Sequence, residues 1–395
     1  MTRPIDRNRP SSLRRSGPVV ALTVVGALLA ACSSSAVRAP TTTPSSVRSS
    51  PTTQAPSSGT KVPLTGLVDM GIQSAYQRGQ PFPTTDPGAL DAYAGAFGGI
   101  VVNESWSQLE PSPGVEQWAP LDRSLAAVQA WNDAHPSTPL GVKLRIFAGY
   151  GAPSWVVQQA GPPVTLVTKG GARSVGRWWT TPFRQAWSSF QHAMAARYDP
   201  DPLIRAVSVS SCSSITGEPF VISGSVSAQQ ALTSAGWSPQ AQENCLAGAL
   251  ADYSGWVRTP VTFAFNTLGT PSGPDADVTA QLMRSCAASH SHGGPTCVLG
   301  NNDLSSEAPS GRQSSVYSEI TSLWAAMPGE VAVYFQTVGA GVDCPAVDVA
   351  VAHHAGSVEL WPHNHAYLGF SAFPASTLAG WDAALRTGRA PNCSG

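Results

Sequence analysis

The chain has 395 residues, a formal net charge of −1 and only 12% charged residues. Nucleic-acid recognition needs a concentrated basic face, so this balance argues against nucleic acid as a partner. Five arginines lie within the first 15 residues, and an apolar run follows over residues 18–31. That run is too short to cross a bilayer comfortably as a mature helix. A basic segment followed by a short apolar one is typical of a secretory signal.

The apolar run ends in Leu29-Ala30-Ala31-Cys32, and three serines follow it. This spelling resembles the bacterial lipobox, whose cysteine is lipidated and becomes the N-terminus of the mature chain. An ordinary cleavage site with an incidental cysteine is the alternative. We expect residues 1–31 to be a lipoprotein signal peptide and Cys32 to carry the lipid. The protein would then be exported and anchored at the outer face of the cell membrane.

A Ser-, Thr- and Pro-rich segment follows over residues 32–61. It has no periodic apolar face and cannot bury enough surface to offset its ordering entropy. We expect a disordered linker there, and one folded domain over residues 62–395, acting as a monomer.

Six cysteines remain in that domain: Cys212, Cys245, Cys286, Cys297, Cys344 and Cys393. An even set in an exported protein predicts disulfides, although about fifteen pairings are open to six cysteines. We favour pairs of neighbours in sequence, because each pair closes a modest loop. Some buried free thiols are the alternative. No Cys-x-x-Cys occurs, and we expect no metal site.

Eight β-like runs alternate with helical stretches along the domain. The strand candidates are Gly66–Gln73, Gly99–Asn103, Gly141–Phe147, Arg205–Ser210, Val261–Asn266, Thr296–Gly300, Glu330–Gln336 and Ser357–Trp361. The helical stretches are Leu121–His135, Pro182–Tyr198, Pro239–Val257, Asp277–Ala288, Ser314–Ala326, Pro345–His354 and Ser376–Arg386. This alternation predicts parallel strands with helical crossovers. Eight repeats favour a closed (β/α)8 TIM barrel over an open doubly wound sheet. No Gly-x-Gly-x-x-Gly opens a first helix, and we expect no cofactor.

Apolar and polar residues alternate along most of these strands. In the third strand one face is apolar, and Lys143, Arg145 and Phe147 lie on the other face. In the first strand Asp69 lies opposite the apolar face in the same way. Polar groups cannot lie unpaired against the helical shell, so we expect them to line the lumen of the barrel. Those late in each strand would line its C-terminal mouth, where barrel enzymes carry their chemistry.

The predicted mouth combines carboxylates, amides, one guanidinium and indoles. Its members are Asn103, Glu104, Trp106, Arg145, Glu218, Asn266, Asn302, Asp303, Gln336, Glu359 and Trp361. Amides hydrogen-bond hydroxyl groups and indoles stack on the C–H faces of sugars, so this set favours a carbohydrate ligand. The alternative is that they are satisfied structural polar groups.

One segment carries a family resemblance. Trp106 begins Trp-Ser-Gln-Leu-Glu-Pro-Ser-Pro-Gly, and Trp118 and Leu121-Asp122 follow. This resembles the second-strand segment of clan A glycoside hydrolases, the β-galactosidase- and cellulase-like superfamily of TIM barrels. Three shorter matches agree with it: Pro153-Ser154-Trp155, Gly217-Glu218, and Glu359-Leu360-Trp361-Pro362. The resemblance implies that Glu218 is the acid/base, and that Trp155 and Trp361 contact sugar.

Two departures from the family pattern matter. Members of the family have Asn-Glu where this chain has Gly217-Glu218. The catalytic nucleophile of the family is a glutamate where this chain has Gln336. An amide cannot form the glycosyl ester of a retaining mechanism. Either another carboxylate serves, with Glu359 first and Glu307 or Asp303 next, or the barrel only binds glycan.

We therefore expect a surface-anchored glycosidase with Glu218 and Glu359 as its catalytic carboxylates. Because these would approach from opposite sides of the mouth, their spacing would suit inversion better than retention. A buried structural salt bridge between Glu359 and Arg145 is the alternative. A non-catalytic glycan-binding lipoprotein is the second candidate function, and a solute-capturing lipoprotein is the third.

Overall fold

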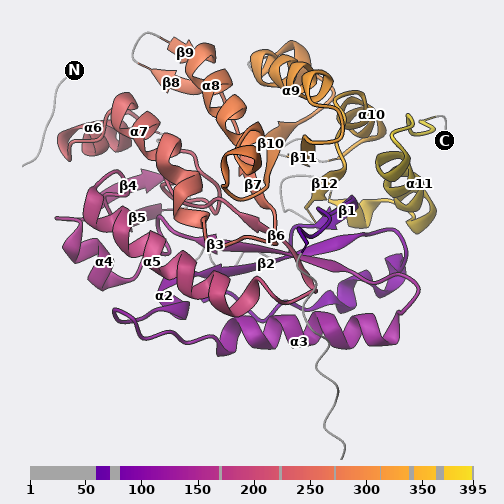
Figure 1. Cartoon of the computed structure of the whole chain (residues 1–395), viewed down its shortest axis with the longest axis horizontal. Coiled ribbons are helices and arrows are strands. Elements are labelled where there is room, and N and C mark those ends of the chain that lie inside the picture. The colour runs from indigo at the N-terminus through magenta and orange to yellow at the C-terminus, as the bar shows by residue number, and fades with distance from the viewer. Residues whose placement is uncertain are drawn as a thin grey trace, which may run out of the picture. The chain divides into compact units, whose positions relative to one another are not determined.

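Eight parallel strands close into a barrel in the order β1–β12–β11–β10–β7–β6–β3–β2. Figure 1 shows the helices arranged around them. The strands are β1 (Gly66–Asp69), β2 (Gly99–Ser105), β3 (Gly141–Phe147), β6 (Ile204–Ser208), β7 (Val261–Ala264), β10 (Cys297–Leu304), β11 (Ala332–Thr337) and β12 (Ser357–Leu360). The predicted (β/α)8 barrel is therefore confirmed.

The computed structural model describes residues 59–71, 81–168, 171–221, 225–270, 273–311, 313–337, 342–361 and 369–393. All of them belong to the unit Pro56–Gly395. The expected signal peptide, Cys32 and most of the expected linker lie outside the described residues.

The larger helices of the outer layer are α3 (Ala119–Ala134), α5 (Thr181–Tyr198), α7 (Pro239–Ala249), α8 (Ala276–Ala287), α9 (Ser314–Ala326), α10 (Cys344–Ala352) and α11 (Ala375–Thr387). Several begin at a side-chain cap that satisfies a free backbone N–H. Ser238 caps α7, Asp275 caps α8 and Asp343 caps α10. These helices cover the outward faces of the strands, whose buried Val, Ile and Leu side chains form the main core.

Four further elements are inserted between strands and helices. They are the short helices α2 (Trp106–Leu109), α4 (Ser154–Gln159) and α6 (Val226–Ser234), and the hairpin β4–β5 (Val164–Thr168, Gly171–Val175). A second small hairpin, β8–β9, spans Leu268–Thr270 and Gly273–Asp275. The hairpins were not predicted.

The segment before β1 closes the amino-terminal end of the barrel. The Lys61 ammonium donates to the carbonyls of Asp201 and Ile204 at 2.6 and 2.9 Å, and to the Thr259 hydroxyl at 2.7 Å. Pro63 and Leu64 then line a lumen cavity of only about 10 Å³, which is room for about one water molecule. The lumen is therefore a packed core at this end.

Three disulfides each join a helix of the outer layer to another segment of the chain. They join Cys212 to Cys245, Cys286 to Cys297, and Cys344 to Cys393. The six cysteines are thus paired in sequence order, as we expected, and such disulfides are typical of exported proteins. None of the described helices is long and apolar enough to cross a membrane.

Candidate functional site

The lumen holds a cluster of four charged side chains. Lys143 and Arg145 enter it from β3, Glu359 from β12, and Glu218 from the loop that follows β6. Each residue is at most 4% exposed. Because the cluster contains two cations and two anions, it is neutral overall, as buried charges require. We call these four residues the lumen quartet.

Arg145 is the centre of the quartet. Its Nη2 atom donates to Glu218 Oε1 at 3.0 Å and to Gln336 Oε1 at 3.2 Å, and it also donates to Glu359 Oε2. Two carboxylates and an amide from three parts of the barrel therefore share one guanidinium nitrogen. The two carboxylates are close together, but the guanidinium group lies between them.

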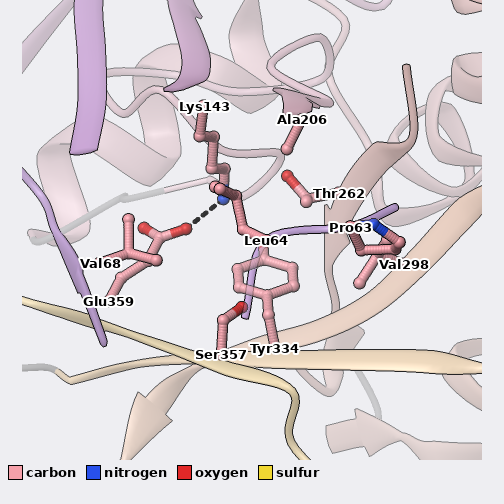
Figure 2. A pocket seen from close by; sticks show the side chains of 10 residues that line it. All are labelled: Pro63, Leu64, Val68, Lys143, Ala206, Thr262, Val298, Tyr334, Ser357 and Glu359. Atoms are coloured by element: carbon pink, nitrogen blue, oxygen red, sulfur yellow. Dashed lines mark hydrogen bonds and ion pairs between the residues drawn. The ribbon is translucent and has the colours of Figure 1, made fainter. Parts of the chain in front are cut away.

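Glu359 is held from both sides. One carboxylate oxygen accepts from Arg145 and the other accepts from Lys143, as the dashed line from Lys143 in Figure 2 shows. Burial alone would raise the pKa of Glu359, but the charges of Arg145 and Lys143 outweigh it and hold that pKa below its ordinary value. Glu359 is therefore an ionised, fully paired group inside the barrel.

Lys143 lies deeper in the lumen than Arg145. Its ammonium is 4.0 Å from the centre of the Tyr334 ring and 3.8 Å from Glu218 Oε1. Burial lowers the pKa of Lys143, and the charge of Glu359 opposes that shift. Burial also raises the pKa of Tyr334 well above its ordinary value, so its hydroxyl is neutral. Figure 2 shows the Tyr334 ring and the Thr262 hydroxyl beside Lys143.

A row of amides continues from the quartet along the mouth. Asn302, at the end of β10, donates to Glu218 Oε2 at 2.8 Å. Asn266, just after β7, donates to the side-chain oxygen of Asn302 at 2.8 Å. Trp361 follows β12, is half-buried and donates to the Thr337 carbonyl at 2.8 Å. Glu218, Asn302, Asn266, Gln336 and Trp361 form the group that we call the mouth cluster.

Asn103 lies near this group. It is in register with Arg145 across β2 and β3, and its side-chain nitrogen donates to the Met70 carbonyl at 2.9 Å. Its side-chain oxygen is buried and has no protein partner.

Two predicted mouth residues lie elsewhere. Glu104 is in register with Ile146 on the helix-facing side of β2. Burial raises its pKa, and the nearby charge of Arg123 in α3 opposes that shift with a smaller effect. Trp106 is fully buried between the barrel and the helices, 5.0 Å from the Trp187 ring centre. The expectation that they line the mouth is therefore wrong. Beyond Asn103 the strand still alternates, so Glu104 faces outward, while Trp106 begins a helix.

Two further residues lie at the border of the site. Trp155 packs edge-on against Trp106, with 6.2 Å between the ring centres, and donates to the Glu110 carbonyl. It therefore packs with Trp106 between the barrel and the helices. Asp303 is half-buried and lies within 3.5 Å of the Gln313 amide.

The predicted position of Glu359 is also wrong. We placed it at the mouth as a catalytic carboxylate, but it is 1% exposed and bound to two cations inside the barrel. The first strand also differs: Val68 is in register with Glu359, and Asp69 with Leu360. Asp69 therefore faces the helices. The left-handed glycines Gly66, the first residue of this short strand, and Gly71, two residues after its end, mark turns that an apolar pattern does not reveal.

Sequence reasoning placed Lys143 in the lumen but gave it no role. The signal was present: two cations two residues apart on one strand face need two buried anions. Among the described residues, no group of three or more His, Cys, Asp or Glu side chains could hold a metal ion.

No family model matches the chain, and no curated protein matches its sequence. Solved structures do match. Endo-glycoceramidase II from Rhodococcus sp. is 16% identical, with a TM-score of 0.46, over 77% of this chain and 74% of that chain. The beta-galactosidase from the psychrophilic Marinomonas ef1 is 13% identical, with a TM-score of 0.44, over 81% of this chain and 59% of that chain. These values are too low to transfer a function.

Proposed function

We propose that the chain is an exported carbohydrate-binding barrel that holds a glycan at the mouth cluster without cleaving it. One observation carries this proposal: both candidate catalytic carboxylates, Glu218 and Glu359, are bound to the same nitrogen of Arg145. A charge-compensated quartet of this kind supports a structural role for Glu359. A glycan would contact Glu218 and the amides Asn302 and Gln336 beside it, which are 4–5% exposed.

The chemistry of glycoside cleavage argues for binding alone. A retaining enzyme needs a carboxylate nucleophile about 5–5.5 Å from its acid, and an inverting enzyme needs room for a water molecule between carboxylates about 6.5–9.5 Å apart. Gln336 cannot form a glycosyl ester. Glu218 and Glu359 both accept from Arg145 Nη2, so neither an anomeric carbon nor a water molecule can come between them without displacing the guanidinium group.

The mouth cluster suits a polyhydroxylated ligand. Asn266, Asn302 and Gln336 offer amide donors and acceptors, Glu218 offers carboxylate oxygens, and Trp361 offers a partly exposed indole face. Amides bind hydroxyl groups and indoles stack on sugar rings. Hydrolysis with Glu218 as acid remains the second candidate function. It is favoured by the position of Glu218 in the loop after β6, with one oxygen bound to Asn302 at 2.8 Å.

Titration calorimetry and product chromatography on a panel of soluble oligosaccharides separate the two functions. The panel contains β-1,4-, β-1,3- and α-1,4-linked glucans, lactose and chitotetraose. We expect the wild type to bind at least one glycan and cleave none, and Glu218→Gln to weaken that binding. Cleavage by the wild type that Glu218→Gln reduces by several powers of ten would establish a hydrolase instead.

Gln336→Glu gives a matched test of the nucleophile position. A glutamate there would still accept from Arg145 and would supply the carboxylate that a retaining mechanism needs. If this variant cleaves a glycan that the wild type only binds, the barrel is a lapsed retaining glycosidase. If it binds and does not cleave, the mouth geometry itself is unsuited to catalysis.

Lipid anchoring through Cys32, a monomeric state and a position at the outer face of the membrane belong to the same proposal. The three disulfides support export, since such bonds persist in oxidising compartments.

A further inference from the structure

The loop that carries Glu218 is held from outside the barrel. It leaves β6 and passes Cys212, which is bonded to Cys245 of α7 and has a left-handed backbone (φ 61°). Non-glycine residues rarely adopt this conformation unless their surroundings impose it. Helix α7 therefore fixes the backbone of this loop six residues before Glu218.

Gln242 of α7 makes a second contact with Cys212. Its side-chain nitrogen donates to the Cys212 carbonyl at 2.7 Å. Its oxygen accepts from the indole nitrogens of Trp178 at 2.9 Å and Trp237 at 3.3 Å. An indole can only donate and a carbonyl can only accept, so these three partners fix the orientation of the amide. Gln242 is 2% exposed.

A short chain of hydrogen bonds continues from Cys212 to Glu218. The Ser213 hydroxyl lies 3.1 Å from the Ser210 carbonyl and 2.9 Å from the Thr216 carbonyl and donates its one proton between them, and Thr216 donates to the Glu218 carbonyl at 2.9 Å. Gly217 lies against the Arg145 side chain, where a Cβ atom would be 2.7 Å from Cγ and Cδ. Contacts at Cys212, Ser213, Thr216 and Gly217 therefore constrain the backbone between α7 and the carboxylate.

We infer that Gln242 is a positioning residue. From the helical layer it fixes the Cys212 carbonyl, and through the loop it holds the Glu218 carboxylate between Arg145 and Asn302. The functional meaning of this role rests on the proposed function, because Glu218 matters there as a ligand contact. The positioning itself can be measured without any glycan.

The test follows the side-chain amide of Asn302 by NMR, in protein labelled with ¹⁵N and assigned with Asn302→Asp. Its protons bond to a carboxylate, and such charge-assisted bonds are shorter and stronger than neutral ones, so its resonances report the contact with Glu218. Glu218→Ala gives their position when the contact is lost. We expect Gln242→Met to move them most of the way to that position. Gln242→Glu, which keeps an acceptor for both indoles but cannot donate to Cys212, should move them as well.

Gln191→Met is the matched control. Gln191 is a buried glutamine of α5 that also accepts from an indole, that of Trp256 at 3.0 Å. Its bond to Trp256 lies between α5 and the segment after α7 and not at the Glu218 loop, so the Asn302 resonances should stay unchanged although the fold is destabilised. Unchanged resonances in folded Gln242→Met would overturn the inference. If that variant does not fold, unchanged resonances in folded Gln242→Glu would overturn the inference in the same way. Absence of glycan binding would refute the proposed function but leave this result intact.

Discussion

Arg145 determines much of what the mouth can do. A buried ion pair is costly to desolvate and is stable only when every charge has a partner. In the lumen quartet that condition is met because Lys143 and Arg145 from one strand meet Glu359 and Glu218 from two other segments. Removing any one member leaves an unbalanced charge in a region of low dielectric constant.

Glu359→Gln should therefore destabilise the protein by about 3–5 kcal/mol, because Lys143 loses its closest anion. Urea unfolding followed by tryptophan fluorescence measures this loss. Lys143→Met in the same chain should recover part of it, since the cluster is then neutral again. Glu319→Gln is the control: its partner Arg284 is mostly exposed, so the expected loss is below about 1 kcal/mol. Equal stability of Glu359→Gln and the wild type would contradict the structural role of Glu359.

The sequence was informative about such residues only to a point. Strict alternation correctly placed Lys143, Arg145, Gln336 and Glu359 on the lumen side, because a strand has a period of two. It could not tell how deep Glu359 lies, since depth depends on the stagger between neighbouring strands. The assignment to the mouth was wrong for Glu104, which lies within β2 on its helix-facing side, and for Trp106, which begins α2.

At the level of elements, β10 and β11 are matched in shape. Gly300 of β10 is in register with Tyr334 of β11, and a Cβ atom on Gly300 would be 1.9 Å from the Tyr334 ring. The missing side chain leaves room for the ring to fill the lumen above Val298 and beside Lys143. Large and small side chains alternate in this way to fill a closed barrel.

Gly300→Ala should destabilise the protein by roughly 1–3 kcal/mol, because the ring must shift away from Lys143. The thermal unfolding midpoint measures the effect. Gly380→Ala in α11 is the control: a Cβ atom there meets nothing within 4 Å, and alanine favours a helix over glycine by about 1 kcal/mol. The first variant should therefore melt below the wild type and the second at or above it. A Gly300→Ala midpoint equal to that of the wild type would show that the ring is not held by this contact.

The sequence predicted the eight barrel strands and the major helices because their apolar periodicities are long and clear. β3 and α9 match their predicted bounds, Gly141–Phe147 and Ser314–Ala326. The hairpin β4–β5 was missed because two strands of only five residues each carry too little periodic signal. Pairing of the strands across the barrel is also a tertiary property that local sequence does not encode.

For the whole molecule, three buried carboxyl groups set the response to pH. Burial raises the pKa of Asp69 to about 7, of Glu104 to about 8 and of Asp252 to about 6. In the unfolded chain these groups ionise near their ordinary values of 3.8 and 4.5. As pH rises from about 4 to about 8, the unfolded state therefore loses protons that the folded state keeps, and stability falls.

We expect the thermal unfolding midpoint to be higher at pH 5 than at pH 8. Three lowered pKa values act in the opposite direction. That of Glu359 does so only below pH 4.5, where protonation would weaken the quartet, and those of His353 and His354 do so below their ordinary value of 6.5. Glu104→Gln removes the group with the highest of these pKa values, so it should flatten the profile and raise stability at pH 8 by on the order of 2 kcal/mol. A midpoint that rises steadily from pH 5 to pH 8 would contradict this assignment.

Anchoring is also a property of the whole molecule. If Cys32 is lipidated, the wild type should sediment with membranes, and Cys32→Ala should be found in the soluble fraction or the medium. Mass spectrometry of the mature N-terminus would identify a diacylglyceryl group on Cys32. A soluble wild-type protein that begins at another residue would disprove the lipobox interpretation.

The contacts of Lys61 have a mechanical consequence. The leading segment is bonded to the carbonyls of Asp201 and Ile204 and to Thr259, and the Val62 carbonyl accepts from Arg205 at 2.7 Å. These partners flank β6 and β7, which are separated from β1 by two strands on one side of the barrel and three on the other. Any pull on the leading segment is therefore carried first by these hydrogen bonds, and β1 comes under tension only after they break.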